Sequence, residues 1–161
     1  MCGIFAIGGQ ENDAGAQVLS GLKKLEYRGY DSWGIAVKSS DGRVHVKKGV
    51  GKISQVKETF PKSTQAIGHT RWATHGTVTK KNAHPHTVGR VTLVHNGIVE
   101  NFQELKKRLS KKYTFKTQTD SEVFAALIDS KLGKRTGPAT ALRKAAKEIE
   151  GRFALVVFVE G

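Results

Sequence analysis

The chain has 161 residues, a length typical of one domain, with 38% hydrophobic and 25% charged residues. Its formal net charge is +13, from 27 basic and 14 acidic side chains, and it contains one cysteine, Cys2. One cysteine excludes an intramolecular disulfide and suits a reducing cytoplasm. No apolar run approaches the roughly 20 residues of a membrane-spanning helix, and the opening run lacks a basic leader, so we expect an unexported cytoplasmic protein without membrane contact.

The first part of the chain predicts a strand, a helix and then further strands. Residues 2–9 read as a buried strand ending at two glycines, and residues 12–29 have apolar side chains at helical spacing, with Asn12 or Asp13 as N-cap. Residues 32–49 predict a β-hairpin around Asp41 and Gly42. Residues 65–76 predict a strand that leads into a loop, and residues 89–97 predict a strand that ends in a turn.

Three helices and a strand follow. Asn101 with Glu104, and Thr119 with Glu122, have the spacing of a capping box ahead of apolar helical positions. Pro138 favours the first turn of a third helix. Residues 152–161 are apolar almost throughout and predict a strand buried on both faces. This order of elements indicates a layered α+β domain.

Cys2 lies where removal of Met1 would make it the N-terminal residue. An N-terminal amine, with a pKa of about 7.7–8.0, is substantially neutral near pH 7 and can accept the proton of a thiol. One residue would then supply both the nucleophile and its base. Taken alone, a single cysteine near a terminus is more often incidental, and lipidation is disfavoured because the sequence around Cys2 matches no lipidation signal.

Asn96 and Gly97 form an Asn-Gly pair at the end of a predicted strand. An asparagine amide beside a glycine N–H can provide two donors for the oxyanion that develops during acyl transfer. The same pair is also the commonest tight hairpin turn.

Two charged side chains are candidates for binding an amino acid. Arg71, with Thr74 and His75 nearby, has a planar guanidinium that suits a carboxylate, although a surface ion pair is an alternative. Asp120 begins a predicted helix and could accept a substrate ammonium or simply cap the helix. A nucleophile, oxyanion donors, a carboxylate partner and an ammonium partner together suit a free amino acid with a side-chain amide, and glutamine fits.

Six segments occur in the order found in class II glutamine amidotransferases, which are N-terminal-nucleophile hydrolases: MCGIFAI, LEYRGYDSWGIAV, GHTRWATHG, NAHPH, VHNGIVENF and TDSEV. The chain resembles this family over residues 1–161, and is most similar to the glutaminase domain of its glucosamine-6-phosphate synthase branch. The resemblance implies one glutaminase domain over residues 1–161. It also implies a four-layer αββα sandwich with two antiparallel sheets between helices, incomplete at its C-terminal end.

The resemblance also implies a role for each candidate residue. Cys2 would be the nucleophile and, through its freed amine, the base, and Asn96 and Gly97 would form the oxyanion hole. The residues implied to hold or order the substrate are Arg28, Arg71, Trp72, Thr74, His75 and Asp120. The implied reaction converts glutamine to glutamate and ammonia through a γ-glutamyl thioester, without a metal or an organic cofactor.

Full enzymes of this branch carry two sugar-isomerase domains that transfer the ammonia to fructose 6-phosphate. The resemblance therefore implies that these domains are absent here, and that a separate isomerase subunit or a further C-terminal segment completes the reaction. Trp33 departs from the family, which usually has alanine there, and the large indole could crowd the site or fill a gap elsewhere.

Other readings of the sequence remain open. The chain could be the glutaminase subunit of another amidotransferase, or a silent domain in which a retained Met1 blocks the amine. Five of the six histidines lie between His69 and His95, which raises a metal-dependent hydrolase, but no metal-binding motif accompanies them. The +13 charge could serve a basic binding module, but no nucleic-acid-binding motif is present, so a solvated lysine-rich surface is favoured.

Overall fold

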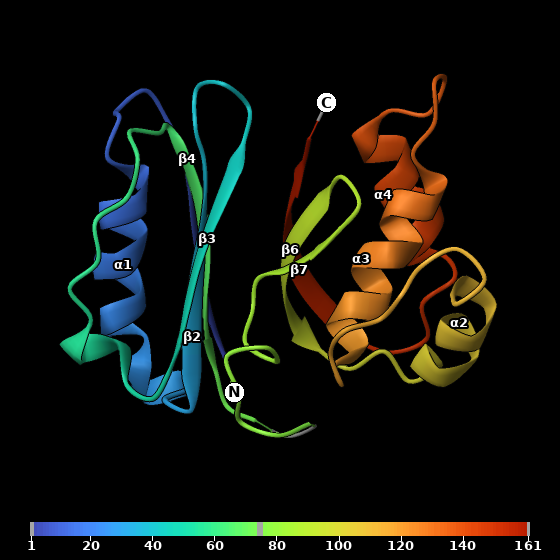
Figure 1. Cartoon of the computed structure of the whole chain (residues 1–161), viewed down its shortest axis with the longest axis horizontal. Helices are drawn as coiled ribbons and strands as arrows, with labels where there is room; N and C mark the ends of the chain where they lie inside the picture. Colours follow the sequence, from blue (N-terminus) through green and yellow to red (C-terminus); the bar gives the residue numbers. More distant parts are fainter. Residues whose placement is uncertain (1, 74–75, 161) are drawn as a thin grey trace.

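The computed structural model describes residues 2–73 and 76–160, whose elements form four layers (Figure 1). The first sheet contains, in spatial order, β1 (Gly3–Gly8), β4 (Gln65–Arg71), β2 (Ser32–Lys38) and β3 (Val44–Val50). The second contains β5 (His86–Val88), β6 (Val91–Gly97) and β7 (Phe153–Val159). Every pairing in both sheets is antiparallel.

Helices cover the outer face of each sheet (Figure 1). Helix α1 (Ala14–Lys24) lies on the first sheet, and α2 (Phe102–Leu109), α3 (Asp120–Lys131) and α4 (Pro138–Ala146) lie on the side of the second. Two short 3₁₀ helices span Glu26–Arg28 and Ile53–Gln55. The predicted αββα layering is confirmed. Within the described ranges, every helix is too short or too polar to cross a membrane.

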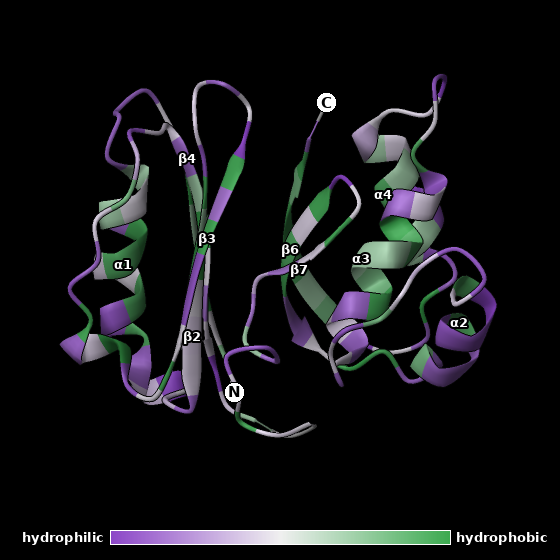
Figure 2. Ribbon diagram, viewed as in Figure 1, coloured by the Kyte–Doolittle hydropathy of each residue, from purple (hydrophilic) through white to green (hydrophobic). Residues whose placement is uncertain are grey.

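The alternation of side chains along the strands produces this layering. In β2, Trp33, Ile35 and Val37 face α1, whereas Ala36 faces the other sheet and packs with Ile67 and Val94. Helix α3 is buried almost throughout, because the second sheet and the other two helices surround it. Figure 2 shows the contrast between α3, which is largely hydrophobic or neutral, and the mainly hydrophilic α2.

Trp33 lies away from the space between the sheets. Its side chain is 6% exposed in the core beneath α1, and the indole covers Gly49 of β3 so closely that a Cβ there would lie 2.6 Å from the ring. Of the two outcomes considered for this residue, gap filling is therefore the correct one. The indole occupies volume that a glycine on the neighbouring strand leaves open.

The two predicted capping boxes do not form. Asn101 and Thr119 are the N-cap residues of α2 and α3, but neither side chain bonds to its own helix. The Asn101 amide instead donates to the Glu148 carbonyl at 2.8 Å and accepts from the Glu150 N–H at 3.2 Å. The Glu122 carboxylate accepts hydrogen bonds from residues 116 and 117. A distant segment has therefore replaced the local partner of Asn101, whereas Glu122 bonds to the residues just before its own helix.

The last strand also differs from its prediction. Most side chains of β7 are half-buried rather than buried, because this strand lies at the edge of its sheet and pairs only with β6 among the described residues. The short strand β5, which forms a hairpin with β6, was not predicted. The pattern of residues 86–88 is too short to indicate a strand.

Candidate active site

The start of β1 and the ends of β4 and β6 meet at one edge of the interface between the two sheets. Cys2 directly precedes β1, and Gly3 pairs with Thr70 near the end of β4. Asn96 lies near the end of β6, and the alternation of that strand places it on the same face as Val94, toward the first sheet. Antiparallel pairing brings the start of β1 beside the end of β4, and packing of the two sheets against each other adds the end of β6.

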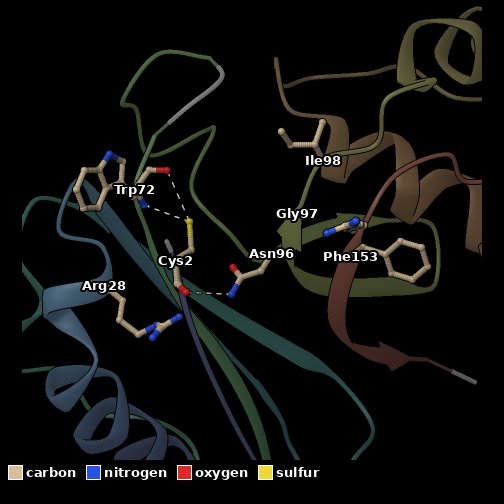
Figure 3. A pocket seen from close by; sticks show the side chains of 8 residues that line it. Cys2, Arg28, Trp72, Asn96, Gly97, Ile98 and Phe153 are labelled. Atoms are coloured by element: carbon tan, nitrogen blue, oxygen red, sulfur yellow. Dashed lines mark hydrogen bonds between the residues drawn. The ribbon is translucent and has the colours of Figure 1, made fainter.

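The Cys2 thiol is half-buried and held by the backbone of Trp72. Its Sγ accepts a hydrogen bond from the Trp72 N–H at 3.3 Å and lies 3.6 Å from the Trp72 carbonyl oxygen. The Asn96 side chain donates through Nδ2 to the Cys2 carbonyl at 3.0 Å. Figure 3 shows Asn96 reaching toward Cys2 from the second sheet, with Arg28 on the other side of the cysteine.

Among the described residues, three hollows are lined by Cys2, and two of them also include Trp72 and Gly97. A cavity of about 580 Å³ is lined by Cys2, Arg28, Trp72, Asn96, Gly97, Ile98, Arg152 and Phe153. A smaller hollow of about 50 Å³ is lined by Cys2, Arg71, Trp72, His84, His95, Asn96, Gly97, Thr119, Asp120 and Ser121. The two share four lining residues, among them the cysteine. The thiol therefore lies at the junction between the larger cavity and the smaller hollow that contains Arg71 and Asp120.

Gly97 is required by its backbone. Its φ is +130°, a conformation that side chains disfavour, and a Cβ at this position would lie 2.1 Å from the Arg152 carbonyl oxygen. The absence of a side chain lets β7 approach the end of β6 and leaves the backbone beside Asn96 open to the cavity.

The smaller hollow contains one group of each charge. Arg71 is 5% exposed and donates to the Thr77 carbonyl at 3.3 Å. Burial lowers the pKa of its guanidinium, and nearby negative groups partly offset this, so the group keeps its charge. Asp120 is the first residue of α3, and its Oδ2 accepts from the Val99 N–H at 2.8 Å. A cation and an anion in one recess suit the α-carboxylate and α-ammonium of an amino acid.

The remaining predicted residues differ in their placement. Arg28, at the end of the first 3₁₀ helix, lines the larger cavity. Trp72 contacts Cys2 through its backbone, while its indole is 46% exposed and packs against Tyr30 with ring centroids 5.7 Å apart. Thr74 and His75 lie outside the described residues.

Several residues of the site were not predicted. Ile98, Arg152 and Phe153 line the larger cavity because β7 pairs with β6, a partnership that no local pattern indicates. Asp31 accepts a hydrogen bond from the Ala73 N–H at 2.8 Å. This bond stabilises the position of residues 72 and 73, which follow β4. Its position in the YRGYD segment was the available signal.

Four buried histidines adjoin the site: His69, His84, His86 and His95, which we call the buried histidine cluster, and two of them, His84 and His95, line the smaller hollow. Burial lowers the pKa of each, to about 3 for His69, so the rings are neutral near pH 7. Although His84 contacts two other rings of the cluster, the described residues contain no group of three or more His, Cys, Asp or Glu side chains placed to hold a metal ion. Within the described ranges, these histidines therefore do not form the metal site that a metal-dependent hydrolase would need.

The buried histidine cluster contacts the site at two places, Asn96 directly and Asp120 through Ser121. His69 Nε2 lies 2.9 Å from Asn96 Oδ1. On the other side, His84 Nε2 and His95 Nδ1 each lie 2.9 Å from the hydroxyl of Ser121, which lies 3.3 Å from Asp120 Oδ1. No local sequence signal predicts the three histidine contacts, because each joins different segments.

Comparison with known proteins points to one family. A family model described as a glutamine amidotransferase domain matches residues 69–160. The glutamine–fructose-6-phosphate aminotransferase (isomerizing) of Bartonella quintana is 47% identical over 166 residues, which cover 100% of this chain and 27% of the relative. The enzyme of the same name from Gluconobacter oxydans is 46% identical, over 98% of this chain and 26% of the relative. The chain thus spans about a quarter of the length of these relatives.

A solved structure has the same arrangement of elements. The glutamine phosphoribosylpyrophosphate amidotransferase of B. subtilis, complexed with ADP and GMP, superposes with a TM-score of 0.80 and 27% sequence identity. The match covers 99% of this chain and 35% of that protein.

Proposed function

The chain belongs to the glutamine amidotransferase family, and we propose that its Cys2 thiol hydrolyses the side-chain amide of glutamine to glutamate and ammonia. One observation carries the proposal. Cys2, the only cysteine of the chain, lines the smaller hollow together with Arg71 and Asp120. The side-chain amide of Asn96 donates a hydrogen bond to the backbone carbonyl of Cys2 at 3.0 Å. A nucleophile and a candidate oxyanion donor therefore come from different sheets to one point.

The first half of the reaction forms a thioester. After Met1 is removed, the free amine of Cys2 accepts the thiol proton, directly or through one water. The sulfur attacks the amide carbon of glutamine, and the carbonyl oxygen becomes an oxyanion that Asn96 Nδ2 and the Gly97 N–H stabilise. When the oxyanion collapses, the C–N bond breaks and the nitrogen leaves as ammonia with the proton held by the Cys2 ammonium.

The second half releases glutamate. Water attacks the thioester carbon while the amine of Cys2 removes a proton from it. The C–S bond then breaks, the sulfur recovers its proton, and the acid is released. The sum of both halves is glutamine plus water giving glutamate plus ammonia, and no oxidant or reductant enters.

The smaller hollow would hold the backbone of the substrate. Arg71 would bind the α-carboxylate and Asp120 the α-ammonium, which leaves the side-chain amide directed to Cys2. We propose further contacts from Thr74, His75 and the backbone of Trp72, and an ordering role for Arg28 beside Cys2.

The names of the relatives support a wider proposal. We infer that residues 1–161 act as one glutaminase domain, in the cytoplasm, and that its ammonia serves amination of fructose 6-phosphate by sugar-isomerase domains on a further segment or on a separate subunit. The solved relative is instead named a glutamine phosphoribosylpyrophosphate amidotransferase, so another acceptor for the ammonia is the alternative.

Covalent labelling tests the proposed nucleophile. Intact-mass measurement first establishes removal of Met1, and the processed protein is then treated with a diazoketone analogue of glutamine. We expect one equivalent of label on Cys2, slowed by added glutamine, and no ammonia release by Cys2→Ala, whose circular dichroism should match the wild type. Processed protein that reacts with iodoacetamide at Cys2 but not with the glutamine analogue would contradict the proposal.

A further inference from the structure

The side-chain amide of Asn96 is held from both ends. Its Nδ2 donates to the Cys2 carbonyl at 3.0 Å, and its Oδ1 lies 2.9 Å from His69 Nε2. An amide oxygen only accepts hydrogen bonds, so His69 must carry its hydrogen on Nε2. The two contacts together define which end of the amide faces the cysteine.

His69 is built to hold this one arrangement. It lies on β4 with 0% exposure, on the same face as Ile67, which packs between the sheets. Burial lowers its pKa to about 3, although the bond to Asn96 opposes this, so the ring is neutral near pH 7 and carries a single N–H. The backbone of His95 also hydrogen-bonds the ring and opposes the lowering of its pKa, and the contact with Asn96 engages Nε2.

We propose that His69 is a positioning residue that keeps the Asn96 amide turned with its N–H groups toward the reacting carbonyl. The inference rests on the proposed function of Cys2 and Asn96. Without the histidine, the amide could rotate by 180° and turn Oδ1, in place of Nδ2, toward the Cys2 carbonyl, and an oxygen there would repel an oxyanion instead of donating to it. A donor lost from such a site typically lowers kcat by ~10²–10³.

Other members of the buried histidine cluster provide a comparison. His86 is also buried, at 2% exposure, but its Nε2 lies 3.1 Å from the hydroxyl of Thr119 rather than beside Asn96. Replacement of either histidine by leucine removes a buried ring and its polar contact. Only replacement of His69 removes the partner of the Asn96 amide.

The experiment compares His69→Leu, His69→Gln and the control His86→Leu in the processed protein. We expect His69→Leu to lower kcat by ~10²-fold with KM changed less than ~3-fold, because the donor acts in the transition state. Binding of glutamate γ-semialdehyde should weaken by a similar factor, since its carbonyl forms a hemithioacetal with the thiol, whereas binding of glutamate should not change. His69→Gln should restore much of kcat through its own amide donor.

The control His86→Leu should keep the wild-type ratio of semialdehyde affinity to glutamate affinity. That same ratio in His69→Leu would overturn the inference while leaving the proposed function intact. An inactive wild-type protein that also fails to bind the semialdehyde would overturn both.

A measurement on the wild type covers the case in which His69→Leu does not fold. Long-range ¹H–¹⁵N correlation spectra distinguish which ring nitrogen bears hydrogen, and the signals of His69 are identified by their loss in His69→Gln. We expect the Nε2–H tautomer. The Nδ1–H tautomer would overturn the proposal, because the ring would then have no hydrogen to donate to Asn96.

Discussion

Lowering the pH below 6 should unfold this protein steeply, because unfolding transfers neutral buried histidines into water, where each takes up a proton. Burial lowers the pKa of His69, His84 and His86 in the folded state, to about 3 for His69. In the unfolded chain their pKa returns to ~6.5. The unfolded state therefore binds more protons below pH 6.5, and the free energy of unfolding is highest above that pH and falls as the pH falls toward 3.

The size of the effect follows from the number of protons. Each such histidine contributes a slope of about 1.4 kcal/mol per pH unit once the pH is well below 6.5. Three of them give about 4 kcal/mol per pH unit, so acidification from pH 6 to pH 4.5 would remove about 6 kcal/mol. Because a typical domain has a total stability of about 5–15 kcal/mol, this loss is comparable to the whole.

Urea unfolding at a series of pH values between 7.5 and 4.5, followed by the fluorescence of the buried Trp33, measures the slope. His86→Gln should reduce the slope by about 1.4 kcal/mol per pH unit, because one proton fewer is taken up. His45→Gln is the control, since His45 is exposed, and should leave the slope unchanged. A stability that does not vary between pH 7 and 5, or an equal slope in His86→Gln, would refute the reasoning.

Three further substitutions separate catalysis, binding and stability. Gly97→Ala should lower kcat by ~10²-fold in steady-state assays, because its Cβ would lie 2.1 Å from the Arg152 carbonyl and displace the oxyanion site; unchanged kcat would argue against that site. Ser121→Ala should raise KM for glutamine by ~3–10-fold with little change in kcat, since the hydroxyl contacts Asp120; a fall in kcat alone would contradict an ammonium-binding role. Trp33→Ala should lower the free energy of unfolding by about 3–5 kcal/mol in urea titrations but keep kcat, because the indole packs beneath α1; lost kcat with unchanged stability would place it in the site instead.

Most of the elements were predictable from local patterns. The hairpin around Gly42, the helix that starts at Pro138 and the strand that ends at Gly97 all follow from periodicity and turn residues, and the structure contains each of them. The failures have several causes: residues 86–88 are too few to indicate a strand, β7 lies at a sheet edge, and the capping residues found other partners. Asn101 is the N-cap residue of α2, but its side chain bonds to Glu148 and Glu150 and not to the helix. These partners belong to a segment that approaches Asn101 only in the folded protein.

The candidate site was partly predictable. Ordered motifs identified the family and its fold, and the structure brings Cys2, Asn96 and Gly97 to one cavity. Their catalytic roles stay predictions. The sequence contained Arg152 and His69 as well; nothing near Arg152 marks it, and His69 lies in the GHTRWATHG segment, which does not indicate that its ring contacts Asn96.

The sequence by itself determined which reactive side chains the protein contains. It also determined the face of each strand or helix on which they lie, because alternation and helical spacing depend on neighbouring residues alone. Only the tertiary structure decided that His69 meets Asn96 and that Ser121 lies between two histidines. Such contacts depend on how one sheet packs against the other and on where α3 begins. Packing of this kind depends on apolar burial summed over the whole chain, and no local segment encodes it.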